Sequence, residues 1–216
     1  FKDEWWISCQ EPVALPGGGE ACFFRLPFHL TSVPEEANLY ITSAGRFRLY
    51  VNGRPVICGP CKGDRWNHYV TAVELSPYLT AGDNVLAVHV VCWPGRDELR
   101  GVPGPVSVIP ARTGAALLTV GVIGETDLST ARAPWQALAD EADAWEGVGA
   151  YDDEHTVIPY IIATQRVKAE RLPEGWNLPG ELGWKQAKRR WRVGMQPGGE
   201  LVPLPLKMAP IPPMAE

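Results

Sequence analysis

The stretch that decides the fold is Ala44-Gly-Arg-Phe-Arg-Leu-Tyr-Val-Asn-Gly-Arg-Pro-Val56. Polar and apolar residues alternate from Arg46 to Val51, and this period of two predicts a strand that buries one of its faces. Asn52-Gly53 follows at once. Because both residues adopt positive φ at low cost, the pair predicts a tight hairpin turn into a second strand at 55–57.

Further short β segments lie on both sides of this hairpin. Strands are predicted at residues 22–30, 39–42, 68–73, 85–91, 105–109, 115–123 and 157–167. The run 85–91 is almost continuously apolar, which favours a central strand covered on both faces. Residues 75–79 indicate one short helical turn and residues 81–84 a chain turn. The segment Trp135–Trp145 is compatible with a helix or with a strand and a loop.

Composition points to the same fold class. The chain has 216 residues, of which 22 are Gly and 21 are Pro, about a fifth of the total against an average of roughly 12%. So many turn-forming residues argue against a helix bundle and a coiled coil. No run approaches the ~18 apolar residues of a membrane-spanning helix. We predict an all-β sandwich of the jelly-roll, galactose-binding-like type over residues 1–170, followed by an irregular Pro/Gly-rich extension over 171–216.

Charge and cysteine content limit the partners and the compartment. The net charge of −5 argues against a nucleic-acid partner. The basic residues between Lys185 and Arg192 are interpreted as side chains that lie over the protein surface. Five cysteines cannot all pair with one another, which slightly favours a reducing, cytoplasmic compartment. The chain begins with Phe1, so we expect a processed or excised segment; the sequence leaves the oligomeric state open.

Cys58-Gly-Pro-Cys61 spells the tetrapeptide of thiol–disulfide oxidoreductases. That chemistry requires a helix that starts at the motif, because the helix dipole and free N–H groups lower the pKa of the first thiol. Here the motif follows a predicted hairpin strand, and Lys62-Gly-Asp64 continues as a loop. A redox protein is therefore the third-ranked hypothesis, and the spacing to His68 or Cys92 does not fit a structural zinc site.

The ordered motifs of the chain resemble the N-terminal, accessory β-sandwich domain of bacterial α-L-rhamnosidases and similar glycoside hydrolases. The matching motifs are the segment 44–56 above, Gly59-Pro60, Tyr78-Leu79 and Gly82-Asp-Asn-Val-Leu-Ala-Val88. Later in the chain, Gly175-Trp176, Trp184-Lys-Gln-Ala187 and Pro210-Ile-Pro-Pro213 are similar to motifs that follow the sandwich in those enzymes.

The resemblance implies a function for the parent protein rather than for this chain. In the family, hydrolysis takes place in a separate helical barrel that carries paired carboxylates. We therefore expect a non-catalytic, carbohydrate-associated domain with no catalytic residues of its own. Its expected partners are rhamnose-containing glycans and a C-terminal catalytic domain, with neither a nucleic acid nor a membrane. The main alternative is a docking module that binds no sugar; a free-standing glycosidase lacks a convergent carboxylate pair in the sequence.

Two segments of the sequence have the composition of a sugar site, in which an aromatic face stacks on the ring and polar groups bind its hydroxyls. Each places Trp beside charged residues at the end of a predicted strand, where binding groups are usually mounted. The candidate carbohydrate-binding residues are Asp64, Arg65, Trp66, His68, Trp93 and Arg96. The alternative is that these Trp side chains pack under loops or against another domain.

No cofactor and no metal site are predicted. Calcium binding is left open at Asp83-Asn84 or at the acidic segment Asp152-Asp153-Glu154-His155, because calcium prefers hard oxygen ligands. Neither segment has the spacing of a known calcium loop. An exposed acidic loop is the preferred interpretation of the second one.

Overall fold

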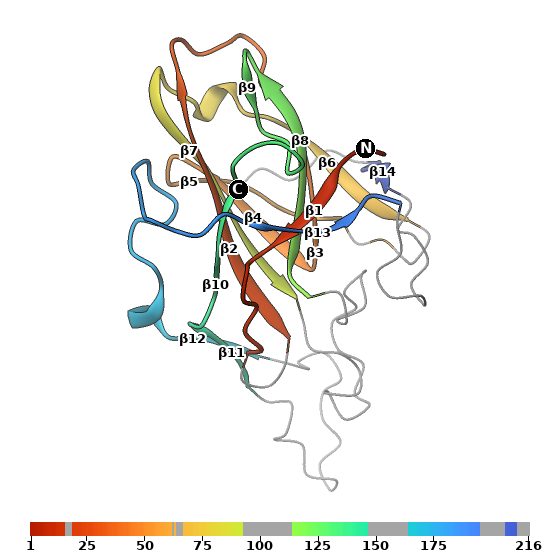
Figure 1. The fold of residues 1–216 in the computed structure, drawn as a ribbon, viewed down its shortest axis with the longest axis vertical. Coiled ribbons are helices and arrows are strands. Elements are labelled where there is room, and N and C mark those ends of the chain that lie inside the picture. Colours follow the sequence, from red (N-terminus) through yellow and green to blue (C-terminus); the bar gives the residue numbers. More distant parts are fainter. Residues whose placement is uncertain are drawn as a thin grey trace, which may run out of the picture.

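The protein is a β-sandwich of two main sheets, with a separate two-stranded sheet (Figure 1). A computed structural model describes residues 1–15, 19–61, 63, 67–92, 114–146, 164–194 and 206–210. Within these ranges the helical elements are two short 3-10 turns, η1 (Ser76–Tyr78) and η3 (Ala169–Arg171). The described part of the chain contains no helix with the length and hydropathy needed to span a bilayer.

The larger sheet has the strand order β13-β1-β8-β3-β6-β14, with β9 paired to β8. Neighbouring strands are antiparallel except β14 and β6, which run parallel. Its strands are β1 (Trp5–Ser8), β3 (Asn38–Ala44), β6 (His68–Glu74), β8 (Ala116–Ile123), β9 (Thr126–Asp127), β13 (Lys188–Arg192) and β14 (Leu206–Met208).

The smaller main sheet has the antiparallel order β10-β2-β7-β4-β5. Its strands are β2 (Glu20–Leu30), β4 (Arg46–Val51), β5 (Arg54–Gly59), β7 (Gly82–Cys92) and β10 (Gln136–Ala139). The two-stranded sheet pairs β11 (Asp143–Glu146) with β12 (Thr164–Val167). Strand β7 is central, as the apolar run 85–91 predicted.

The predicted all-β sandwich is confirmed, and so is the hairpin that decides it. Asn52 and Gly53 have φ values of 51° and 80° and join β4 to β5. The finer jelly-roll, galactose-binding-like assignment stays a prediction, as does the division at residue 170. The structure does show that β13 and β14, both within 171–216, pair with strands of the sandwich (Figure 1).

Three sequence expectations need correction or completion. Residues 82–84 belong to β7 rather than to a turn, because Gly82, at φ 101°, already pairs with Leu30 of β2. Segment 135–145 forms strands β10 and β11 with a turn between them, which selects the strand-and-loop alternative. The predicted strand 105–109 and part of 157–167 lie outside the described residues.

The core lies between the two main sheets and follows the period of two. On β4, Phe47, Leu49 and Val51 are buried inward, while the polar partners of the alternation face outward. Trp135 closes one side of this core at 1% exposure, and its indole Nε1–H donates to the carbonyl of Leu128 over 3.0 Å. A buried indole with a satisfied N–H contributes its full apolar area to stability.

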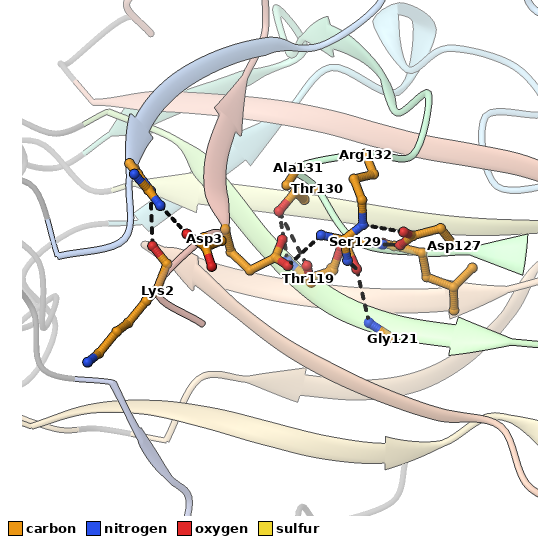
Figure 2. A network of polar contacts seen from close by, with 12 residues as sticks. Lys2, Asp3, Thr119, Gly121, Asp127, Ser129, Thr130, Ala131 and Arg132 are labelled. Carbon is orange, nitrogen blue, oxygen red and sulfur yellow. Dashed lines mark hydrogen bonds and ion pairs between the residues drawn. The ribbon is translucent and has the colours of Figure 1, made fainter.

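A polar network ties the N-terminal segment to the turn that follows β9 (Figure 2). The guanidinium of Arg132 bonds to Asp127, to Ser129 Oγ over 2.8 Å and to Glu4 Oε1 over 3.1 Å. Thr119 of β8 donates to the Leu128 carbonyl over 2.7 Å. The edge strand β13 is anchored to the same N-terminal segment, since Arg192 bonds to Asp3 and to the carbonyl of Lys2.

Gly45 is the only residue between β3 of one main sheet and β4 of the other. Its φ of +117° lies in the left-handed region, and a Cβ at this position would lie 2.4 Å from the carbonyl oxygen of Val91. A side chain here would therefore be strained twice, by the dihedral and by backbone that cannot move without disturbing β7.

We expect Gly45→Ala to lower the free energy of unfolding by about 3 kcal/mol or more, from dihedral strain and steric overlap together. The matched control is Gly82→Ala, because Gly82 has φ +101° but nothing within 4 Å of an added Cβ. Urea denaturation of both variants should give a clearly larger loss for Gly45→Ala. Equal losses would contradict the close approach to Val91.

Candidate functional site

Aromatic side chains gather on the outer face of the five-stranded sheet. Phe23 of β2 and His89 of β7 stack with ring centroids 4.4 Å apart and an interplanar angle of 16°. Trp176 lies over both, 4.7 Å from Phe23 and 6.3 Å from His89, and its edge meets Tyr50 at 5.2 Å. We call Phe23, Tyr50, His89, Trp176 and Trp184 the aromatic cluster.

The segment 172–187, which we call the covering segment, brings the two Trp residues onto this face. Arg25 of β2 holds it: the Arg25 guanidinium donates to the carbonyls of Leu178 and Gly180 over 3.0 and 2.6 Å, and lies 5.9 Å from the Trp184 ring. Arg25 has no exposed surface, and burial lowers its pKa, opposed by the charge of Glu181. The covering segment therefore supplies two backbone carbonyls that accept hydrogen bonds from this buried guanidinium.

His89 also meets two buried carboxylates, one from the turn after β10 and one from the first residue of β11. Its Nε2 lies 2.8 Å from Asp140 Oδ2 and 3.8 Å from Asp143 Oδ2. Asp140 and Asp143 are 1% and 2% exposed, whereas the His89 side chain is 21% exposed. The two carboxylates face one imidazole instead of opposite sides of a cleft, so this is not the arrangement of a glycosidase acid–base pair.

A groove of about 350 Å³ opens beside the aromatic cluster, within the usual range of 300–1,000 Å³ for small-molecule sites. Its walls combine apolar side chains with two carboxylates and one guanidinium. The lining residues are Phe23, Leu138, Ala139, Asp140, Glu141, Arg171 and Pro173. The groove and the cluster of His89, Asp140 and Asp143, which we call the His89 cluster, were both missed from the sequence. The one available signal was Phe23, an aromatic residue in the predicted strand 22–30.

Of the six predicted carbohydrate-binding residues, His68 alone lies within the described part of the chain. Asp64, Arg65, Trp66, Trp93 and Arg96 lie outside it. The strand ends that flank these segments are at one end of the sandwich, because Gly59 of β5 pairs with Phe47, which pairs with Val90 of β7. The proposal that the other five residues bind sugar is therefore carried forward as a second location.

His68, at the start of β6, is fully buried. Its Nε2 hydrogen-bonds to Thr42 Oγ1 over 2.8 Å, and its ring lies 5.7 Å from that of Trp6. Burial lowers the pKa of His68 from 6.5 to about 4. The ring is therefore neutral at pH 7 and packs in the sheet, with no surface turned toward a ligand.

The cysteine motif at 58–61 and the Asp83-Asn84 pair considered for calcium make contacts within the fold. Cys58 lies on β5 with its thiol 3.3 Å from Arg48 Nε, and none of the five cysteines is in a disulfide. Among residues 59–61 and 63, which the structure describes, no helix begins that would activate a redox thiol. Asn84 is buried and its amide bonds to Asn52, Thr80 and Gly82, while Asp83 pairs with His29 over 2.8 Å.

The basic residues near β13 bond within the domain, as their interpretation as surface side chains predicted. Lys185 pairs with Glu11 over 3.0 Å, Arg189 donates to the carbonyl of Ala131, and Arg190 lies 5.5 Å from the Trp191 ring. The partners of these three basic side chains therefore belong to the domain itself.

The fold is that of a segment of α-L-rhamnosidases. The chain aligns with a glycoside hydrolase family 78 rhamnosidase of a Bacillus species at a TM-score of 0.62 and 23% identity, over 93% of this chain and 19% of that one. It aligns with an α-L-rhamnosidase of Aspergillus terreus at 0.58 and 17%, over 94% and 22%. The chain thus spans about a fifth of the length of these enzymes.

A lectin of Pleurotus ostreatus, solved in complex with GalNAc, has a related fold. The TM-score is 0.50 and the identity 16%, over 94% of this chain and 47% of the lectin. No protein-family model and no curated protein matches the sequence. At these identities the shared feature is the β-sandwich architecture, so the chemistry of this chain has to be argued from its own residues.

The buried His68 predicts a pH-dependent loss of stability. Its pKa is lower in the folded state, so the unfolded chain takes up the proton first, and the stability contributed above pH 6.5 is lost as the pH falls toward 4. Between pH 7 and 4.5 the free energy of unfolding should fall by about 2–3 kcal/mol more in the wild type than in His68→Gln. Urea denaturation at the two pH values measures both. Parallel pH profiles of the two proteins would contradict this placement of His68.

Proposed function

We propose that this chain is a non-catalytic, carbohydrate-associated domain of a larger glycoside hydrolase of the α-L-rhamnosidase kind, and that it binds a sugar in the groove beside Phe23. The observation that carries the proposal is the make-up of the groove walls. Leu138 and Pro173 offer apolar surface beside the buried Phe23 ring, while Glu141 and Arg171 offer charged hydrogen-bonding groups. A pyranose needs both, because its C–H face is apolar and its hydroxyls form a polar rim.

The shared fold supports the assignment to a hydrolase. The two rhamnosidases carry this sandwich within chains about four to five times longer, and the lectin was solved in complex with GalNAc. A rhamnose-containing glycan is accordingly the first ligand to test. The remaining length of a rhamnosidase would supply the catalytic domain as the second partner.

Docking without sugar binding is the competing function. The sheet face that adjoins the groove is already covered by the chain's own segment 172–187, through Arg25 and Trp176. A docking surface for a catalytic domain would therefore have to lie elsewhere on the sandwich or on the covering segment itself. Sugar titration separates the two functions.

We expect L-rhamnose or an α-L-rhamnoside to bind at millimolar concentration or below, and Arg171→Ala and Glu141→Gln to weaken this binding at least tenfold. Both side chains are exposed, so these variants should fold as the wild type does. Calorimetry together with Trp fluorescence quenching measures the affinity. Lys188→Ala, an exposed change on β13, serves as the matched control.

The same titration distinguishes the two locations for a sugar. Trp66→Ala and Trp93→Ala should leave the affinity unchanged if the groove is the site. If they abolish binding while the groove variants do not, the sugar sits near Trp66 and Trp93, at the location predicted from the sequence. Absence of any response to millimolar sugar would instead favour the docking module.

A further inference from the structure

We propose that His89, Asp140 and Asp143 form a binding site for one divalent zinc-like cation, which would join β7 to the turn between β10 and β11. Each residue offers one ligand atom, and these atoms all lie within 4.8 Å of one another. The proposal does not rest on sugar binding, although Asp140 also lines the groove.

The distances suit a small cation. Ligands at about 2.0–2.2 Å from Zn²⁺ in tetrahedral geometry lie about 3.4 Å apart. The observed separations from His89 Nε2 are 2.8 Å to Asp140 Oδ2 and 3.8 Å to Asp143 Oδ2, which bracket that value. Shifts of a few tenths of an ångström in the side chains would therefore bring the three atoms into a coordination sphere.

The ligands are held in place by their surroundings. Asp140 Oδ1 accepts the Ala142 N–H over 2.8 Å, and the backbone N–H of Asp140 donates to the carbonyl of Ala21 over 2.9 Å. The His89 ring is fixed against Phe23. Such hydrogen bonds and packing contacts orient metal ligands and reduce the conformational entropy lost when the ion binds.

Charge provides the driving force. Asp140 and Asp143, which are 1% and 2% exposed, both face the His89 imidazole. Burying carboxylate charge is costly unless positive charge compensates it, and a divalent cation compensates both groups at once. One imidazole and two carboxylates form the ligand set of zinc and related metals, whereas calcium requires six to eight oxygens. His89, at 21% side-chain exposure, leaves room for water as a further ligand.

The test titrates Zn²⁺ into the metal-free chain by calorimetry in a Cys58→Ser/Cys61→Ser background, because exposed thiols would bind the same ion. We expect one ion per chain. His89→Gln and Asp143→Asn should each lower the affinity at least tenfold. The control is His29→Gln, which removes the exposed His29–Asp83 pair and should leave the affinity unchanged. Unchanged affinity in both His89→Gln and Asp143→Asn, or no binding by the background protein at 100 µM Zn²⁺ (about 5.5 kcal/mol of binding free energy), would overturn the proposal.

A second measurement needs no change to the site, so it stands even if these variants fail to fold. The ¹⁵N chemical shift of His89 Nε2, recorded in the background protein, should move on addition of Zn²⁺ while those of His29 and His68 stay. Substitution with Co²⁺ should give visible d–d absorption without a thiolate charge-transfer band. A stationary His89 resonance at saturating Zn²⁺ would exclude coordination at this residue.

Discussion

The crossing of the chain at Gly45 is the constraint on which the rest of the sandwich depends. One residue carries the chain from β3 in the larger sheet to β4 in the smaller one, at φ +117° and in contact with the Val91 carbonyl. Because no slack exists at this point, the ends of β3, β4 and β7 are fixed relative to one another. The hairpin at Asn52-Gly53 then sets β5, and antiparallel pairing to β7 sets β2.

This rigid sheet creates a second requirement. Strands β2 and β7 carry bulky or charged residues outward as well as apolar residues inward, so their outer face also needs a cover. The covering segment, which lies near the end of the sequence, provides this cover. It places Trp176 over Phe23 and the carbonyls of Leu178 and Gly180 against Arg25. The groove and the His89 cluster lie at the margin of this cover. Residues from β2, β7, β10 and the covering segment therefore meet there, although they are distant in sequence.

The sequence was sufficient for elements whose local pattern matches their environment. Strand β4, the Asn52-Gly53 turn and the buried β7 were predicted because alternation, turn chemistry and apolar continuity are local signals. Strands β13 and β14 were not predicted, since they are short, lie among Gly and Pro, and are fixed by pairing to β1 and β6. Gly82 illustrates the limit: the residues Ala81-Gly-Asp-Asn84 predicted a turn, yet Gly82 begins a strand.

The candidate sites also divide into those with a local sequence signal and those that depend on strand pairing. Trp66 and Trp93 drew attention because aromatic and charged residues adjoin in the sequence, but adjacency along an extended chain does not imply convergence. His68 was selected in this way and is a buried, neutral ring. The convergence of His89 with Asp140 and Asp143 depends on pairing between β2 and its two neighbours, β7 and β10, and no spacing in the sequence encodes it.

The buried polar groups of the sandwich differ in what they require. Asn84 joins two turns with amide and carbonyl partners, so neutral donors and acceptors are sufficient there. Arg25 holds the covering segment through two backbone carbonyls that accept from its Nη2. A hydrogen-bonded link between β7 and the β10–β11 turn could be made in the same way, from an amide and a carbonyl. The cluster instead contains two buried carboxylates and an imidazole, charged or titratable groups that such a link would not need. Departures of this kind from the least costly arrangement concentrate at functional sites, and for this reason the His89 cluster is better explained by a cation that it binds than by the strands that it joins.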